Sequence, residues 1–263
     1  MGKNKKYSGI FILRVVLVLT ALLLWEYVAR KGYINVFYTS YPSEIIKDLI
    51  EFYTSGDLGR HTKITLQEAL LGLFYGSIVG ILLAVIFSQF KKLGKLIIPI
   101  LSAINCIPQL ALAPVYVLWF GLGLSSKVFL AAFMVFFCVF FSTYNAIKNI
   151  EQSLVESSSL LGANSLQTLF YVVLPACMPW ILSGIRGGVG ACMIGAIIGE
   201  YMGASGGFGW MVTYAASYFN VKRVMSCIFI LLLVGLFLNW LLDRVENLLL
   251  KWRVESDLSI TNY

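Results

Sequence analysis

Charged side chains are scarce in this sequence. They make up 13% of the 263 residues, whereas hydrophobic residues make up 59%. A soluble domain has about a quarter of its residues charged. No soluble fold of this length could hide so much apolar surface, so lipid must cover part of it. The composition excludes an ordinary soluble domain and predicts an integral membrane protein.

Patterns for metal sites, disulfides and catalysis are missing as well. The only histidine is His61, and the five cysteines, an odd number, form no Cys-x-x-Cys pair. We therefore expect no disulfide framework and no metal site, and we expect the cysteines to be small buried apolar residues. No histidine-based or paired-carboxylate arrangement supports an intramembrane enzyme, so we expect no catalytic residue.

A nucleotide-binding loop is also absent. The sequence contains no Gly-x-x-x-x-Gly-Lys-[Ser/Thr] pattern, whose backbone and lysine would hold the phosphates of ATP. We therefore expect that this chain binds no cofactor and does not itself hydrolyse ATP.

The net charge of +7 comes from small basic groups and not from one basic stripe with interleaved aromatic residues. These groups flank apolar runs: Lys3, Lys5 and Lys6 precede the first run, Lys91, Lys92 and Lys95 separate two runs, and Lys251 and Arg253 follow the last. This is typical of helix ends that face lipid headgroups. We expect membrane lipid as a partner and no nucleic acid.

Six apolar runs are candidates to cross the bilayer, which takes about 20 helical residues. The first follows a lysine-rich start but is too long for a signal-peptide core, so we interpret it as a retained helix. The expected spans are about 10–29, 64–88, 96–120, 128–147, 172–199 and 221–250. The predicted fold class is all-α: a polytopic membrane helix bundle of about six transmembrane helices, in a single transmembrane domain over residues 1–263.

Two local patterns add detail to this bundle. Gly72, Gly76 and Gly80 recur four residues apart, a spacing that lets membrane helices approach closely. Outside the spans, Tyr41-Pro42-Ser43-Glu44 is a helix-start signal followed by apolar residues at helical spacing. It predicts a short amphipathic helix lying at the membrane interface.

A polar segment, residues 148–175, interrupts the apolar runs in the second half of the chain. It is long enough for one helix, a turn containing Gly162 and Asn164, and a second short amphipathic helix that ends near Pro175. We expect a helix–turn–helix on the membrane face, with small and apolar side chains suited to docking in a partner's groove.

Here the sequence resembles the binding-protein-dependent ABC importer permeases. Their motif has Glu-Ala-Ala, a Gly three residues later, and Ile-x-Leu-Pro after nine more residues. Glu156, Gly162 and Leu174-Pro175 occupy motif positions, Val172 takes the Ile position, and Ser157-Ser158 replaces Ala-Ala. The resemblance implies that the residues coupling transport to an ATPase are Glu156, Ser157, Ser158, Gly162, Ala163, Leu174 and Pro175.

Two further stretches resemble the nitrate/sulfonate/taurine-type branch of this family. They are Pro108-Gln-Leu-Ala-Leu-Ala-Pro114 with Leu118-Trp-Phe-Gly-Leu-Gly123, and Glu200-Tyr-Met-Gly-Ala-Ser-Gly-Gly-Phe-Gly-Trp210. The resemblance implies a type I importer (MetI-like) architecture that works as a homodimer with two ABC ATPase subunits, which hold ATP and Mg. It also implies an extracytoplasmic substrate-binding protein and a small anionic substrate such as a sulfonate, taurine, nitrate or bicarbonate.

The resemblance further implies the prokaryotic cell membrane as location, with both chain termini cytoplasmic. Lysine and arginine are nearly balanced between the two sides, so the positive-inside rule alone does not decide orientation. An alternative cargo in the same class is a thiamine-precursor pyrimidine or another aromatic nutrient. An ion-gradient-driven transporter would need inverted repeats, and the sequence shows no such repeat.

Polar and ionisable residues within the apolar runs are candidates for a pathway or gate, because a charge in lipid is costly. They are Asn105, Gln109, Arg186 and Glu200, with Glu68 near the start of the second span. For each, a structural role is the alternative: an ion pair with a carboxylate for Arg186, support of a gate for Glu200, and interhelical hydrogen bonds for Asn105 and Gln109.

Overall fold

The computed structural model describes residues 3–250, and every regular element in that range is a helix. In chain order the elements are α1 (Lys3–Arg30), α2 (Val36–Thr39), α3 (Pro42–Thr54), α4 (Asp57–Gln89), α5 (Lys91–Asn105), α6 (Gln109–Phe120), α7 (Leu124–Lys148), α8 (Gln152–Leu160), α9 (Ser165–Thr168), the π-helical turn η1 (Leu169–Val173), α10 (Leu174–Tyr201), α11 (Phe208–Ser217) and α12 (Val221–Leu249). The predicted all-α fold is confirmed.

Four helical stretches are long and apolar enough to cross a membrane: α4, α7, residues 165–201 through η1 and α10, and α12. The pair α5 and α6 makes a fifth if it is one bent span, and α1 covers the predicted first span. About six spans therefore agree with the structure. The predicted basic pair Lys251 and Arg253 lies outside the described residues, as do the side chains of the N-terminal lysines.

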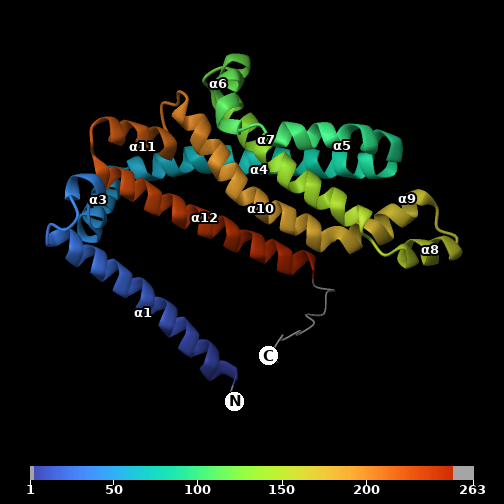
Figure 1. Ribbon diagram of the computed structural model, residues 1–263, viewed down its shortest axis with the longest axis horizontal. Helices are drawn as coiled ribbons and strands as arrows, with labels where there is room; N and C mark the ends of the chain where they lie inside the picture. The colour runs from blue at the N-terminus through green and yellow to red at the C-terminus, as the bar shows by residue number, and fades with distance from the viewer. Residues whose placement is uncertain (1–2, 251–263) are drawn as a thin grey trace. The chain divides into compact units, whose positions relative to one another are not determined.

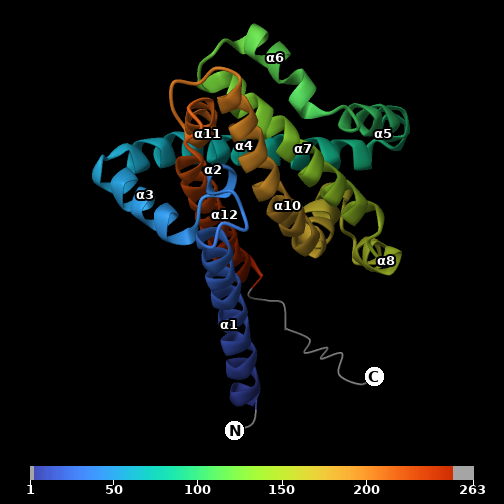
Figure 2. The ribbon, with the colours of Figure 1, turned by 60° about the vertical axis from the view of Figure 1, so that its left-hand side comes forward.

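The predicted third span is broken in the structure. Residues 96–120 form not one helix but α5 and α6, which meet at an angle of 99°, and Figure 2 shows the two helices running in different directions. Pro108 explains the break, because proline has no N–H and disfavours helical conformation in the residue before it. As a result Asn105 ends α5 while Gln109 begins α6, so these two residues do not share a helix as predicted.

The structure comprises two compact units. One consists of the residues up to Ile64 together with Gly206–Leu232, and the other of Thr65–Ser205 together with the residues from Leu233 on. The boundary falls inside the two long helices α4 and α12.

Helix α7 forms the centre of the second unit, between α4 and α10 (Figure 1). A Cβ added at Gly76 of α4 would lie 2.7 Å from the Cβ of Val135, and one at Gly195 of α10 would lie 2.6 Å from the Cα of Ala131. Real side chains do not approach so closely, so glycine is needed at these two contacts. The close approach predicted for the glycines of the second span is present.

Phenylalanine side chains fill the space that the close helix contacts leave. Phe136, Phe137 and Phe140 of α7 form a buried cluster with Ala84 of α4, and residues of α5 such as Ile98 pack against it.

Three of the five cysteines are buried, as predicted, whereas Cys106 and Cys138 are exposed. Cys138 lies on the apolar helix α7, whose outer face lipid would cover, and Cys106 directly follows the end of α5.

In the first unit, α3 and α11 pack around a small core. The ring of Phe52 is fully buried and makes an edge contact with Phe208. The His61 ring stacks on Trp210 and accepts a hydrogen bond of 2.9 Å from the Gly207 N–H. Gly207 lies directly before the first residue of α11.

Candidate coupling segment and buried charge cluster

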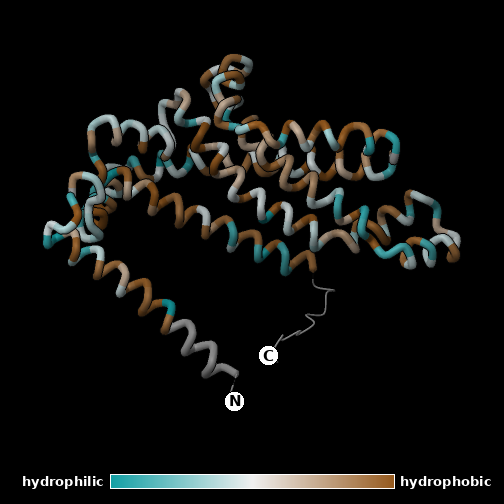
Figure 3. The backbone as a smooth tube through the Cα atoms, viewed as in Figure 1, coloured by the Kyte–Doolittle hydropathy of each residue, from teal (hydrophilic) through white to brown (hydrophobic). Residues whose placement is uncertain are grey.

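The polar segment forms the predicted helix and turn, but its second helix does not stop at Pro175. Figure 3 shows hydrophilic residues along α8 and α9 between the more hydrophobic α7 and α10. After the turn, α9, η1 and α10 run on as one helical stretch, Ser165–Tyr201. The π turn provides the reason: the Leu174 N–H bonds to the Leu169 carbonyl five residues back. This wider turn accommodates Pro175, which has no N–H for the α-helical ladder.

Gly162 ends α8 in a conformation that favours glycine. Its φ is +85°, and its N–H bonds to the Ser159 carbonyl at 2.9 Å while the Ala163 N–H bonds to the Ser158 carbonyl at 3.0 Å. This pair of bonds is a Schellman motif with Gly162 in the left-handed position. A Cβ at Gly162 would meet no atom within 4 Å, so the backbone and not crowding requires the glycine.

Asn164 begins the next helix, a role that the sequence analysis did not assign. Its side chain accepts a hydrogen bond from the Gln167 N–H at 2.8 Å, and the Gln167 side chain accepts one from the Asn164 N–H at 2.8 Å. This is a capping box in which two orphan N–H groups are satisfied reciprocally. The spacing Asn164-x-x-Gln167 was the signal that could have revealed it. The turn is therefore fixed on both sides of Gly162.

The Ser-Ser pair that replaces Ala-Ala has two different environments. Ser157 is exposed, whereas Ser158 is buried. The Ser158 hydroxyl donates to the Val155 carbonyl at 2.7 Å and lies 3.1 Å from the Thr168 hydroxyl. The buried hydroxyl is thus satisfied by a bond within α8 and a bond to α9, so the departure from the motif links the two arms of the turn.

An apolar core attaches this segment to the membrane helices. Leu169 and Val173 of η1 are buried with Ala146 and Cys177 of the adjoining helices, and Val155 of α8 packs against them. Leu174 and Pro175 are half-buried at the start of α10. The segment is therefore held rigidly on α7 and α10.

The tip of the segment exposes apolar side chains. Leu160 and Leu161 are 88% and 89% exposed, and Tyr171 is 79% exposed. A shallow hollow of about 330 Å³ is lined by Leu161, Gly162, Ala163, Gln167, Tyr171 and Val172. Glu156 lies exposed on α8 and accepts a hydrogen bond of 2.8 Å from Gln152. Fully exposed apolar side chains beside a rigid turn are a surface suited to binding another protein.

A second group of functional candidates is a buried cluster of charges in the second unit. Glu68 of α4 and Glu200 of α10 are each 1% exposed. The Lys127 ammonium of α7 lies 3.4 Å from Glu68, and the Thr65 hydroxyl donates to Glu200 at 2.6 Å. The two carboxyl groups interact with each other. Three helices thus meet through one ammonium and two carboxyl groups.

The other pathway candidates have contacts of their own. Arg186 of α10 is partly exposed and forms ion pairs with Asp243 at 2.7 Å and Glu246 at 2.5 Å, both on α12. This contact corresponds to the alternative in which Arg186 pairs with a carboxylate, and sequence reasoning did not identify its partners.

Gln109, at the start of α6, accepts a hydrogen bond of 3.3 Å from the Tyr116 hydroxyl, and Asn105 is exposed at the end of α5. The partners of Gln109 and Arg186 are thus Tyr116, Asp243 and Glu246, which do not belong to the buried cluster that contains Glu200.

Several apolar spans, glycine-mediated helix contacts and an exposed helix–turn–helix between two spans define a class, the polytopic helical permeases. The family of binding-protein-dependent transport system inner membrane components matches residues 76–251. SsuC of Bacillus subtilis strain 168, assigned to aliphatic sulfonate transport, is 30% identical over 95% of this chain and 90% of its own. The formylaminopyrimidine transport permease ThiX of Halalkalibacterium halodurans is 33% identical over 73% of this chain and 77% of its own.

Solved structures show the same fold. An inward-facing structure of the MetNI methionine ABC transporter superposes with a TM-score of 0.65 at 21% sequence identity, covering 73% of this chain and 95% of the other. This chain belongs to the family of binding-protein-dependent transport system inner membrane components. It is a multi-pass membrane protein and the permease subunit of an ABC importer, as the motif around Glu156 and Gly162 predicts.

Proposed function

We propose that this permease acts as a homodimer whose two coupling segments, residues 148–175, each dock into a cytoplasmic ATPase subunit. The observation that carries the proposal is the rigid turn at Gly162 with exposed Leu160 and Leu161 beside it. Such a turn can transmit a push because α8 and η1 share an apolar core with α7 and α10. ATP and Mg bind in the ATPase subunits, whose closure moves the segment and reorients the pathway.

The orientation follows from the coupling role. Docking to a cytoplasmic ATPase places residues 148–175 in the cytoplasm, and with six spans both termini are cytoplasmic. The location is the cell membrane of a prokaryote. An extracytoplasmic binding protein delivers the substrate to the opposite end of the bundle, where α4 and α7 begin.

The substrate we favour is a small anion such as a sulfonate, taurine, nitrate or bicarbonate. The similarity to SsuC supports an anionic sulfonate, whereas the similarity to ThiX supports the alternative, a thiamine-precursor pyrimidine or another aromatic nutrient. In either case, the candidates that line the pathway or support its gate are Asn105, Gln109, Arg186 and Glu200. Glu200 belongs to the buried cluster and therefore supports a gate more readily than it contacts substrate.

The test is uptake into proteoliposomes that contain the permease, its ATPase and its binding protein. Uptake of a radiolabelled sulfonate should require ATP and all three proteins, and replacing Leu160 and Leu161 together by aspartate should abolish it. The matched control is Ser153→Asp, which adds one charge at an exposed position of α8 outside the residues assigned to coupling. Uptake driven by an ion gradient without the ATPase would overturn the proposal. ATP-dependent uptake of a pyrimidine but not of sulfonates would change only the substrate.

A further inference from the structure

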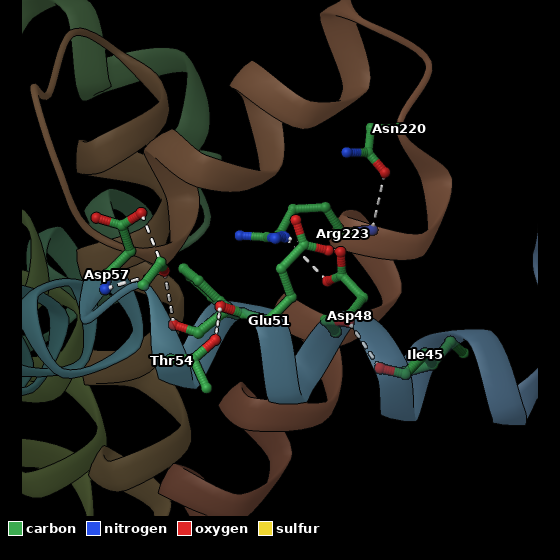
Figure 4. Close-up of polar contacts among 10 residues, drawn as sticks. Ile45, Asp48, Glu51, Thr54, Asp57, Asn220 and Arg223 are labelled. Atoms are coloured by element: carbon green, nitrogen blue, oxygen red, sulfur yellow. Dashed lines mark hydrogen bonds and ion pairs between the residues drawn. The ribbon is translucent and has the colours of Figure 1, made fainter.

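Helix α3 is held against the first turns of α12 by polar contacts (Figure 4). The Arg223 guanidinium lies 2.9 Å from the Asp48 carboxylate and 4.3 Å above the ring of Phe52. The Ser226 hydroxyl donates to the Ile45 carbonyl at 3.4 Å. These contacts fix the rotation of α3 about its axis, since Ile45, Asp48 and Phe52 form its buried face. The remaining faces of the helix therefore have defined directions.

Next to the buried face, α3 has a second apolar face that nothing in its unit covers. Ile46, Ile50 and Tyr53 recur at helical spacing and are 57%, 59% and 72% exposed. The polar residues, including Lys47 and Glu51, occupy the remaining side of the helix. The helix therefore has three sectors: one packed on protein, one apolar and exposed, and one polar. A helix lying in a membrane interface needs this arrangement.

The position of α3 near the first residues of two membrane-spanning helices also indicates a membrane-interface environment. It ends at Thr54, and only two residues separate it from the membrane-spanning α4, which begins at Asp57. Its ion-pair partner Arg223 is the third residue of α12, another span. Helix α3 therefore lies beside the polar first turns of two membrane-crossing helices, and the polar ends of such helices lie among lipid headgroups. Tyr53 suits this level because its ring is apolar and its hydroxyl is polar.

We propose that α3 is an interfacial helix whose exposed apolar face, Ile46, Ile50 and Tyr53, is buried in the phospholipid leaflet on the side where α4 and α12 begin. The proposal rests on the membrane location of the family and not on the ATPase-coupled function. A protein partner that binds this face alone fits less well, because a stable protein interface buries on the order of 800 Å² per partner. Three side chains on one face of a single helix can bury a much smaller area.

Spin-label accessibility tests this proposal on the full-length permease in nanodiscs of phosphatidylethanolamine and phosphatidylglycerol. The exposed Cys106 and Cys138 are changed to alanine, while the buried cysteines stay because they are inaccessible to label. A nitroxide is then attached at Ile50→Cys, with Tyr53→Cys as a second position in case the first variant does not fold. The matched control is Lys47→Cys in the polar sector of the same helix.

Labels at positions 50 and 53 should collide several-fold more often with oxygen, which partitions into lipid, than with a water-soluble nickel chelate. The label at position 47 should show the reverse preference. Equal access of the nickel chelate to all three positions would place the face in water and overturn the proposal. Protection of positions 50 and 53 from both reagents would mean that protein covers the face, which would also overturn it.

Discussion

At the scale of single residues, the sharpest prediction concerns the substitution of Gly162. A non-glycine residue in the left-handed region costs about 1–2 kcal/mol, and asparagine tolerates this region better than other residues. Because a Cβ at position 162 meets open space, substitutions act through the backbone or a docked partner. Gly162→Asn should retain most ATP-dependent uptake, and Gly162→Val should lose it, with both proteins inserted normally. The measurement is uptake per amount of inserted permease; wild-type uptake by Gly162→Val would contradict the coupling role.

A second prediction concerns Lys127 and the buried carboxyl groups near it. Its removal takes away the ammonium that pairs with the buried Glu68 carboxylate, and breaking a buried ion pair costs about 3–5 kcal/mol. Lys127→Met should therefore lower the midpoint of thermal unfolding of the purified permease. Adding Glu68→Gln, which removes one of the two acidic groups, should recover part of the loss. If the double variant is less stable than Lys127→Met, the charges do not form one cluster.

At the scale of elements, the contact between α7 and α10 depends on glycine where the helices touch and not elsewhere. A Cβ at Gly195 would lie 2.6 Å from the Ala131 Cα, whereas one at Gly190 would meet nothing within 4 Å. Alanine also raises helix propensity by up to about 1 kcal/mol in either position. Gly195→Ala should therefore destabilise the permease, because one helix must move, and Gly190→Ala should be neutral or stabilising. Thermal unfolding in detergent measures both, and equal effects would contradict this packing.

The bend between α5 and α6 limits what any sequence-based span prediction could achieve. Membrane helices often tolerate proline because neighbours satisfy the freed carbonyls, so Pro108 alone does not distinguish a kinked span from two helices. The angle of 99° follows from how α5 packs on α4 and α7 through residues such as Ile98. These contacts include α7, which follows α5 only after the bend.

At the scale of the whole molecule, the bent pair determines the topology. If α5 and α6 together cross the membrane, the chain has an even number of spans and both termini lie on one side. If the pair enters and leaves on the same side, the number is odd and the termini lie on opposite sides. We predict that both termini are cytoplasmic. Fluorescent-protein and alkaline-phosphatase fusions at each terminus measure this, and phosphatase activity at either terminus would contradict the prediction.

Much of the architecture could be predicted from local patterns. The long apolar runs imply membrane helices because their backbone must be satisfied within each segment. The turn at Gly162 could also be predicted, because a glycine that ends a helix is a local requirement of the backbone. The spacing of Glu156, Gly162 and Pro175 identified the family, which the comparisons confirmed. The coupling and pathway roles of individual residues remain predictions.

By itself, the sequence determined that this protein is an all-α membrane permease with an exposed helix–turn–helix, because hydrophobic runs, turn residues and motif spacing act over short distances. Only the tertiary structure decided that Lys127 meets Glu68, that Arg186 meets two carboxylates of α12, and that Arg223 holds α3. These contacts depend on how each helix is rotated and how closely its glycines let it approach its neighbour. That information is a property of the packed bundle and not of any one segment.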